Sequence, residues 1–403
     1  MKILHISFSD NRGGASIAGY NIYKSQKMNG FNVKFLCFEK FNKDDDVIEF
    51  NQNQLSKKIS TYKQSLDRRI IKIFINDRNN SYSTGLFGSG LLNYINQFDC
   101  DIVNIHWINN SMLSISEISK IKKKIVWTLH DMWPFCGTEH FSYQNHYQNG
   151  YSKLGFFDLN KFIWNKKLNN FNNKINFISP SNWMHNCAKS SEIFKNMKGT
   201  KIPYTIDFDK WKFNKQDIAK NKIGLNYDES EKVVIFGSER GSKIDRKNFK
   251  TVIQSLENIS KKIKIRLLVF GESEKNYEKK NLSVNYLGKI LDKKYLNYIY
   301  SAGDVLAMPS KLETFGLIAI ESILSGTPCV AFTNTGLEEI IEHKINGYLS
   351  NYLDQSDYEK GLMFFLNKNK KTNLNDHRKK IIDKFDNKKI CFEYINFYKS
   401  ILS

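Results

Sequence analysis

Two glutamates with a Phe-Gly pair between them, Glu313 and Glu321, carry the clearest chemical signal in the sequence. Residues 304–308, which are apolar after Asp304, predict a short buried strand that Pro309 closes. Residues 317–325 predict a helix that ends at a glycine. Backbone N–H groups at the start of that helix would bind a phosphate readily, because no carbonyl of the helix pairs with them. Those N–H groups belong to Thr314, Phe315 and Gly316.

Gly316 and Glu321 are the two residues in this segment whose types most clearly suit contact with a ligand. Gly316 lets the backbone approach a ligand without an intervening side chain. Glu321 is predicted to lie a little over one turn into the helix, among apolar neighbours, so its carboxylate needs polar partners such as two sugar hydroxyls. The alternative is a solvated stripe of Glu321, Ser322 and Ser325 on an ordinary helix that covers a sheet.

The segment from Pro309 to Val330 reads Pro-Ser-x-x-Glu-x-Phe-Gly-x-x-x-x-Glu-x-x-x-x-Gly-x-Pro-x-Val. This pattern resembles that of the retaining glycosyltransferases of family four, which have a GT-B fold. In that family the first Glu and the Phe-Gly backbone face the donor sugar and diphosphate, and the second Glu holds the ribose. The resemblance assigns these roles to Glu313, Phe315, Gly316, Leu317 and Glu321.

A basic loop follows the predicted strand 232–237 and contains Arg240, Lys243, Arg246 and Lys247. The family carries Gly-Arg and then Lys-Gly, and these two cations clamp the diphosphate. Here Ser238 stands in place of that Arg and Asn248 in place of that Gly. The resemblance makes Lys247 the phosphate clamp and leaves open whether Arg240 or Arg246 supplies the second charge; a solvated basic loop is the alternative. Residues 284–290, with Gly288, resemble the segment whose backbone reads the nucleotide base.

The first unit of the chain reads strand, glycine turn, helix, strand, with Gly13 and Gly14 in the turn. This order predicts a doubly wound opening, and the dinucleotide fingerprint G-x-G-x-x-G is missing from it. The glycines could bring backbone N–H groups to a phosphate or sugar, or form a plain tight turn. In the family this loop faces the cleft between the domains.

Two predicted strands, 101–107 and 124–131, each deliver a histidine at the carboxyl end, His106 and His130. Ligands bind at that edge of an open parallel sheet, although a single histidine there is often only hydrogen-bonded support. The segment Trp-Thr-Leu-His-Asp-Met-Trp resembles one in family members that build surface polysaccharides. His130 matches a position beside the transferred sugar, which implies donor-sugar contact or acceptor activation, with His106, Asp131 and Gly13 on the acceptor side.

Metal sites are not expected. Cys136, His140 and His146 have suitable side chains at a spacing that fits no common zinc pattern. Asp207-x-Asp209 lies in the expected interdomain linker, where Asp is typical of turns. The six cysteines are scattered and indicate reduced thiols.

Composition limits the class of protein. The chain has 403 residues, enough for two domains, and 41% hydrophobic residues exclude a disordered chain. No apolar run is long enough for a membrane span, and the N-terminus reads as a strand rather than a signal peptide, so we expect a cytoplasmic protein. The net charge of +20 favours polyanionic partners or reflects compositional drift in a Lys- and Asn-rich chain.

Residues 55–76 predict a basic amphipathic helix with apolar residues at 59, 62, 66, 70 and 73. Such a helix either covers a sheet, with its lysines reaching out to solvent, or lies on an anionic bilayer.

These observations predict an α/β protein with two Rossmann-like doubly wound domains that face each other across a cleft. Residues 1–204 form the acceptor domain, 205–380 the nucleotide-sugar domain, and 381–403 a helix that crosses back. The resemblance implies a retaining, metal-independent glycosyltransferase without cofactor, with a glycan or lipid-linked acceptor in bacterial surface-polysaccharide synthesis, on or near the inner membrane face. The alternatives are a non-catalytic binder of nucleic acid or phospho-ligands and a sugar-nucleotide epimerase of the same fold; basic motifs interleaved with aromatics, typical of nucleic-acid binding, are lacking.

Overall fold

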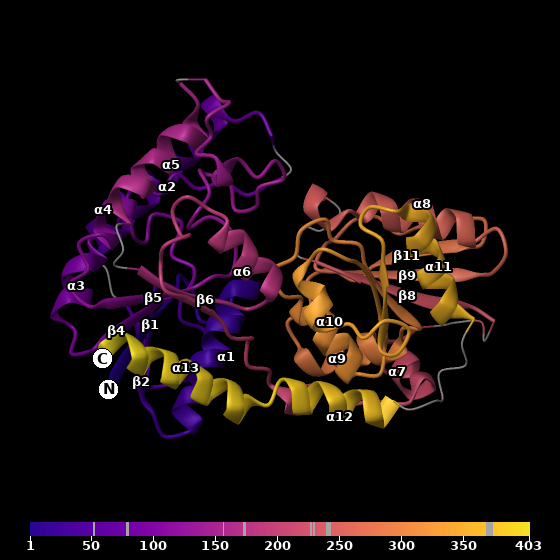
Figure 1. Cartoon of the computed structure of the whole chain (residues 1–403). Helices are drawn as coiled ribbons and strands as arrows, with labels where there is room; N and C mark the ends of the chain where they lie inside the picture. Colours follow the sequence, from indigo (N-terminus) through magenta and orange to yellow (C-terminus); the bar gives the residue numbers. More distant parts are fainter. Residues whose placement is uncertain are drawn as a thin grey trace. The chain divides into compact units, whose positions relative to one another are not determined.

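The computed structural model describes residues 1–50, 53–77, 80–155, 157–171, 175–225, 228, 230–238, 243–367 and 374–403. The chain divides into two compact units, the first made of Met1–Ile206 with Asp386–Ser403 and the second of Asp207–Phe385. Each unit is a mostly parallel sheet with helices packed against it, as Figure 1 shows. The predicted α/β architecture of two doubly wound units is therefore confirmed.

The first unit contains a sheet in which all the described strands run parallel, in the order β3-β2-β1-β4-β5-β6-β7. The central strands are apolar and buried, which is typical of a sheet that helices cover on both faces. The strands are β1 (Lys2–Ile6), β2 (Asn32–Cys37), β3 (Val47–Glu49), β4 (Ile102–Ile105), β5 (Lys124–Thr128), β6 (Ile175–Ser179) and β7 (Gly199–Lys201).

The helices of the first unit pack around a core that includes Trp127, Trp133 and Phe135. Several begin at a side-chain cap, such as Asp158 before α5, whose carboxylate accepts from the Lys161 N–H at 2.9 Å. The helices are α1 (Gly14–Met28), α2 (Gln54–Phe74), α3 (Leu91–Gln97), α4 (Ile115–Ile118), α5 (Leu159–Asn170), α6 (Asn182–Lys189) and α13 (Asn387–Leu402), with a short 3₁₀ turn η1 (His146–Gln148).

The second unit repeats this plan, with the described strands in the order β10-β11-β9-β8-β12-β13-β14. Only β10 runs antiparallel to its described neighbour, β11. The strands are β8 (Lys232–Gly237), β9 (Ile265–Phe270), β10 (Tyr277–Lys279), β11 (Leu282–Tyr286), β12 (Val305–Met308), β13 (Cys329–Phe332) and β14 (Gly347–Ser350).

The helices of the second unit cover this sheet around a second apolar core. They are α7 (Gln216–Lys222), α8 (Phe249–Ile259), α9 (Lys293–Ala302), α10 (Leu317–Leu324), α11 (Gln355–Leu366) and α12 (Leu374–Lys384), with 3₁₀ turns η2 (Phe208–Lys210), η4 (Asp245–Lys247) and η5 (Gly336–Glu339). Among the described residues, no helix combines the length and apolar character that crossing a membrane requires.

The last helix, α13, returns to the first unit, as expected. The side chain of Asn387 binds the backbone of Ile206 through both its oxygen and its nitrogen, at 2.8 and 2.6 Å. Further along the helix, the Tyr398 hydroxyl accepts from Asn104 Nδ2 on β4 at 2.6 Å. Asp386 caps the helix and separates it from α12, which lies wholly in the second unit.

Candidate functional site

The turn between β12 and α10 depends on two glycines. Gly316 has a φ of +106°, a left-handed conformation that favours glycine, and it lies directly before the first helical residue, Leu317. Gly336 lies so close to the turn that an added Cβ would be 2.3 Å from the Thr314 carbonyl oxygen. The Gly336 N–H donates to the carbonyl of Glu313 at 2.7 Å, so the loop after β13 fixes this turn.

Glu313 lies at the centre of a buried charge cluster. Its Oε2 accepts from Lys247 Nζ at 2.6 Å and also lies 3.4 Å from both Arg246 Nη1 and Ser310 Oγ. Arg246 Nη1 additionally donates to the Leu312 carbonyl at 2.9 Å. The structure therefore brings together three of the predicted donor-site residues, and it places two cations against one carboxylate.

The electrostatics keep this pair charged. Burial alone would raise the pKa of Glu313, but Lys247 and Arg246 lower it below its ordinary value. Burial lowers the pKa of Lys247, and the Glu313 carboxylate partly offsets this effect. The two cations exceed the single carboxylate that they contact, so the cluster carries a net positive charge.

The other residues to consider on the donor side are Arg240 and Lys243 of the basic loop, and Gly288. Arg240 lies outside the described residues. Lys243 is mostly exposed and pairs with Glu274 at 2.6 Å. The prediction that the backbone of Gly288 reads the base stays a prediction. Its N–H donates to the backbone carbonyl of Glu272 at 3.1 Å, and its carbonyl accepts from the Gly271 N–H at 2.8 Å. Gly288 thus shapes the loop after β11 with its own backbone groups.

Glu321 has a protein partner that the sequence did not indicate. Its Oε2 accepts from the hydroxyl of Tyr300 on α9 at 2.9 Å, and burial raises the pKa of the carboxyl group. The expected alternative of a solvated stripe is wrong, because Ser322 and Ser325 are both fully buried. Their hydroxyls bind inside the second unit, with Ser325 Oγ donating to Asn297 Oδ1 at 2.7 Å.

The Gly13-Gly14 turn lies at the carboxyl edge of the first sheet, directly before and at the start of α1. Gly13 has a φ of +85°, so a side chain there would be strained. Nothing lies within 4 Å of the position of a Cβ at either residue. Packing therefore does not require glycine at Gly14, which leaves room for a ligand to approach the backbone.

His106 and His130 belong to a buried chain of histidines in the first unit. His5 Nδ1 lies 2.9 Å from His106 Nε2, and His106 Nδ1 lies 2.9 Å from His130 Nε2. His130 Nδ1 ends the chain 2.7 Å from the Tyr204 hydroxyl. At the other end, His5 Nε2 lies 3.0 Å from Gln26 Oε1. Each shared contact needs one donor and one acceptor nitrogen, so three neutral rings with matched tautomers satisfy the whole chain.

The surroundings favour these neutral rings. Burial lowers the pKa of His5 and of His130 to about 4, and it lowers the pKa of His106 well below its ordinary value. Both ring nitrogens of His130 are engaged within the unit, so activation of an acceptor by either nitrogen would first have to break a hydrogen bond. A supporting role or contact through the ring carbons agrees better with this arrangement.

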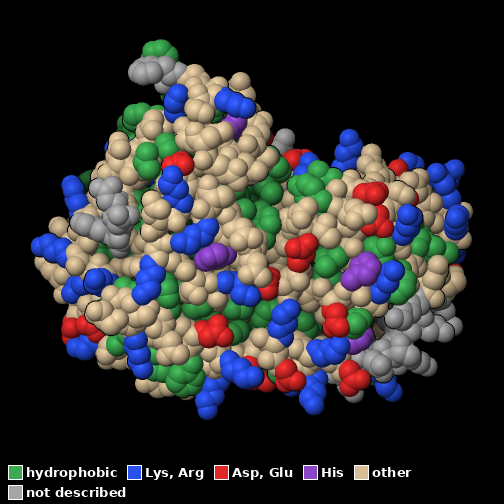
Figure 2. Space-filling model, in the orientation of Figure 1, with side chains coloured by type: hydrophobic (Ala, Val, Ile, Leu, Met, Phe, Trp, Pro, Cys, Tyr) green, Lys and Arg blue, Asp and Glu red, His purple; other side chains and the backbone are tan. Residues whose placement is uncertain are grey.

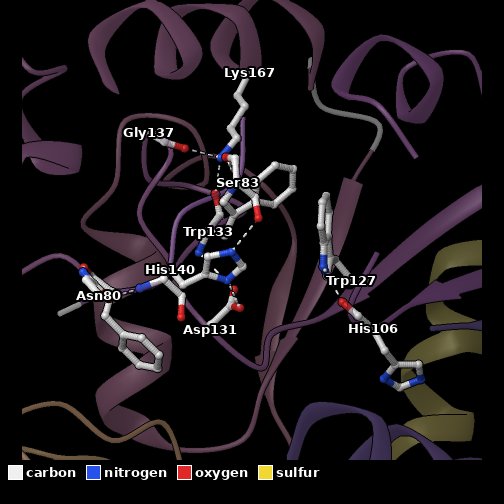
Figure 3. A network of polar contacts seen from close by, with 11 residues as sticks. Asn80, Ser83, His106, Trp127, Asp131, Trp133, Gly137, His140 and Lys167 are labelled. Carbon is white, nitrogen blue, oxygen red and sulfur yellow. Dashed lines mark hydrogen bonds and ion pairs between the residues drawn. The ribbon is translucent and has the colours of Figure 1, made fainter. Parts of the chain in front are cut away.

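Asp131 lies in a neighbouring network shown in Figure 3. Its Oδ2 lies 2.6 Å from His140 Nδ1, and His140 Nε2 lies 3.0 Å from Ser83 Oγ. Burial alone would raise the pKa of Asp131, but His140 lowers it below its ordinary value. This order of groups is also found in nucleophilic triads. Ser83 is buried, however, so its hydroxyl is poorly accessible to a substrate, and Trp133 Nε1 donates to its backbone carbonyl at 2.8 Å. We therefore interpret the network as one that holds Asp131 in place.

The same loop is tied to α5 by the fully buried Lys167 (Figure 3). Its ammonium donates to the carbonyls of Trp133, Cys136 and Gly137, the last two at 2.9 and 2.7 Å. It also lies 3.7 Å from the centre of the Trp133 ring. Burial lowers the pKa of Lys167 to about 7, and the carbonyls satisfy the donors of the buried group.

Cys136, His140 and His146 do not converge. His140 binds Asp131 and Ser83, whereas His146 Nε2 lies 2.6 Å from Gln144 Oε1. In the part of the chain that the structure describes, no group of three or more His, Cys, Asp or Glu side chains could hold a metal ion. Asp207 of the linker pairs with Lys210 at 3.0 Å.

Sequence reasoning missed His5, Tyr204 and Tyr300, each of which contacts a candidate residue. It also missed Gly19 on α1, where an added Cβ would be 2.8 Å from His106 Cγ. A histidine in the middle of an apolar strand was the available signal for His5, because a buried polar group needs a partner. No local pattern pointed to the two tyrosines.

Two Rossmann-like units in one chain define the GT-B class of fold. In the second unit the start of α10 follows β12, and the paired cations Arg246 and Lys247 follow β8. Residues 217–384 match the family described as glycosyl transferases group 1. The N-acetyl-alpha-D-glucosaminyl L-malate synthase of Bacillus anthracis is 24% identical over 53% of this chain and 57% of its own length. The chain thus aligns with little more than half of that relative.

Solved structures agree on the fold. Sucrose-phosphate synthase from Thermosynechococcus elongatus superposes with a TM-score of 0.69 at 14% identity, over 100% of this chain and 99% of its own. Anabaena Alr3699/HepE, solved with UDP and glucose, has a TM-score of 0.63 at 16% identity, over 99% and 100%. The chain therefore has a GT-B fold, and residues 217–384 of it resemble the group 1 glycosyltransferases.

Proposed function

We propose that the protein moves a sugar from a nucleotide-sugar to a hydroxyl of a glycan or lipid-linked acceptor, with retained anomeric configuration and without a metal ion. The observation that carries this proposal is the cluster of Lys247 and Arg246 on Glu313 beside the start of α10. It lies in the segment that matches the group 1 family. The UDP bound by Alr3699/HepE supports a nucleotide-sugar as donor.

The leaving group is the chemical problem that this cluster addresses. During transfer the bond between the anomeric carbon and the diphosphate oxygen breaks, and the diphosphate keeps the electron pair. A bond to the acceptor oxygen forms, and the acceptor proton leaves to the diphosphate or to solvent. Lys247, Arg246 and the N–H groups at the start of α10 would stabilise the departing charge. Fixed cations and a helix start can do this without a metal ion.

Glu321 is proposed to hold the ribose. A carboxylate accepts several hydrogen bonds, so the contact with Tyr300 leaves acceptor capacity for hydroxyl groups. The raised pKa of Glu321 reflects the cost of burying its charge, which two hydroxyl donors would reduce.

The first unit is proposed to supply the acceptor contacts, through Gly13, Asp131 and the edge formed by His106 and His130, whereas Gly14 is proposed to contact the donor. Asp131 is fixed by His140, so its carboxylate is a pre-oriented hydrogen-bond acceptor. The resemblance of residues 127–133 to enzymes of surface-polysaccharide synthesis supports that process for this chain.

The test measures sugar transfer from several nucleotide-sugars, with and without a chelator, and identifies the product by mass spectrometry and the anomeric configuration by NMR. We expect transfer to persist with the chelator and to fall in Glu321→Gln. Tyr300→Phe is the matched control, since it removes the partner of Glu321 and keeps the carboxylate. Release of nucleotide and free sugar without an acceptor product would favour an epimerase. Polyanion binding without turnover of any donor would favour a non-catalytic binder.

A further inference from the structure

Helix α2 (labelled in Figure 1) exposes three of the five apolar residues that its sequence pattern would place against a sheet, whereas Leu66 and Ile70 are half-buried. Ile59, Tyr62 and Ile73 are 45%, 65% and 73% exposed, and Leu55 is 67% exposed. Their spacing of four, seven and eighteen residues from Leu55 puts them on one side of a helix. The interpretation that these residues cover the sheet is therefore wrong for most of the stripe.

A different side of α2 attaches it to the first unit. Ser60 is buried, Lys63 Nζ donates to the Gly88 carbonyl at 2.6 Å, and the Asp67 carboxylate accepts from the Thr84 hydroxyl. Ile70 and Ile71 pack against the apolar core. Because these contacts already anchor the helix, the exposed apolar stripe is not needed to hold it in place.

Basic side chains border the exposed stripe. Lys58, Arg69 and Lys72 are exposed and lie at helical spacing on the side next to the stripe. The helix as a whole carries six Lys or Arg residues and one Asp. The face shown in Figure 2 has Lys and Arg interspersed with Asp and Glu.

We propose that α2 docks on the surface of an anionic lipid bilayer, with the apolar stripe inserted between headgroups and the basic side facing the lipid phosphates. Interfacial helices lie in the plane of the membrane surface and carry an apolar stripe bordered by Lys and Arg. The exposed side of α2 has this pattern. Anionic lipid attracts each basic side chain near its surface, and salt screens this attraction.

Other occupants fit less well. In a second copy of the chain that bound through the same stripe, like basic sides would approach each other, because a two-fold contact uses the same patch twice. A nucleic acid would pair with the basic side and would leave Leu55, Ile59 and Ile73 in water. A bilayer satisfies both sides of the helix at once.

Vesicle binding tests this proposal on the full chain without donor or acceptor, so its outcome does not depend on the proposed sugar transfer. The protein is sedimented with vesicles of phosphatidylcholine alone or mixed with phosphatidylglycerol. We expect binding to the mixed vesicles, weakened by added salt. Arg69→Glu with Lys72→Glu should weaken the partition at least about tenfold, since each charge near an anionic surface contributes about a factor of five.

Two matched controls separate the helix from the general charge and apolar surface of the chain. Lys388→Glu with Lys389→Glu makes the same change in charge at exposed positions of α13 and should leave binding nearly unchanged. Ile59→Ser with Ile73→Ser should weaken binding, whereas Phe41→Ser with Leu291→Ser, at residues 58% and 78% exposed, should not. Circular dichroism checks that each variant is folded.

The proposal is overturned if the wild-type chain fails to sediment with phosphatidylglycerol vesicles. Equal losses in the α2 and α13 charge variants would also contradict it, because net charge alone would then explain binding. Light scattering measures the oligomeric state of the same proteins. If the wild-type chain is a dimer that does not bind vesicles, and Ile59→Ser with Ile73→Ser converts it to a monomer, the partner of α2 is a second copy of the chain.

Discussion

The ammonium of Lys247 donates to Glu313 Oε2 at 2.6 Å inside the second unit, and both side chains are only 11% exposed. The two residues are far apart in the sequence, on η4 and on the turn after β12, so the fold of the unit creates the pair. A ligand phosphate that contacts Lys247 must share it with Glu313. The pair therefore sets the position of the cation in the protein without any ligand.

Replacing Glu313 by Gln should destabilise the fold. The buried Lys247 and Arg246 would lose their shared carboxylate, and breaking a buried pair costs about 3 kcal/mol or more. Urea unfolding followed by circular dichroism measures the change. Lys311→Ala is the control, because Lys311 pairs with Asp245 at the more exposed edge of the same turn at 2.7 Å. We expect that control to cost less than about 1 kcal/mol. Equal losses of unfolding free energy in the two variants would show that the pair formed by Glu313 stabilises the fold no more than the exposed pair does.

Acid should destabilise the protein through its buried histidines. His5 and His130 have a folded pKa of about 4 against an ordinary value of 6.5, so the unfolded chain binds more protons between these values. The free energy of unfolding then falls as the pH falls from 6.5 towards 4, by up to about 1.4 kcal/mol per pH unit for each group that titrates.

The His5→Gln variant isolates one of these contributions. Urea unfolding across the same pH range should show a shallower loss of stability in the variant than in the wild-type chain. Identical slopes would mean that His5 binds protons equally well in the folded and unfolded states, contrary to its burial.

The two glycines of α1, Gly14 and Gly19, should respond differently to alanine. Gly19→Ala should lower stability by roughly 1–3 kcal/mol, because the new methyl group would overlap His106. Gly14→Ala should leave stability nearly unchanged, since nothing lies within 4 Å of the added carbon. If the backbone of Gly14 approaches a substrate, the same change raises KM. Thermal unfolding and steady-state kinetics measure the two effects, and an unchanged KM would assign this turn to structure alone.

The fold was predictable because apolar runs, glycine stops and strand-end turns are local features, and they repeat in both units. The placement of Glu313 at a helix start followed from the same local signals. Its pairing with Lys247 could be proposed only through a family resemblance, because two separate loops meet there. Tyr300 on Glu321, and His5 and Tyr204 at the ends of the histidine chain, depend on packing between distant elements.

Helix α2 is another element whose packing partners the sequence did not reveal. Its periodicity correctly predicted a helix, since the spacing of apolar residues fixes the period. The pattern could not show which side packs against the unit. That depends on Lys63 and Asp67, whose partners Gly88 and Thr84 lie on another segment.

Calorimetric titration of nucleoside diphosphates shows directly whether Lys247 binds a diphosphate. Several bases are titrated into the wild-type chain, into Lys247→Gln, and into Lys311→Ala as the neighbouring control. Lys247→Gln keeps an amide donor for Glu313 and removes the charge. We predict that at least one diphosphate binds the wild-type and Lys311→Ala proteins alike, and binds Lys247→Gln at least about tenfold more weakly, in line with a charge-assisted contact. Equal affinity for Lys247→Gln, or no binding of any diphosphate to the wild-type chain, would contradict it.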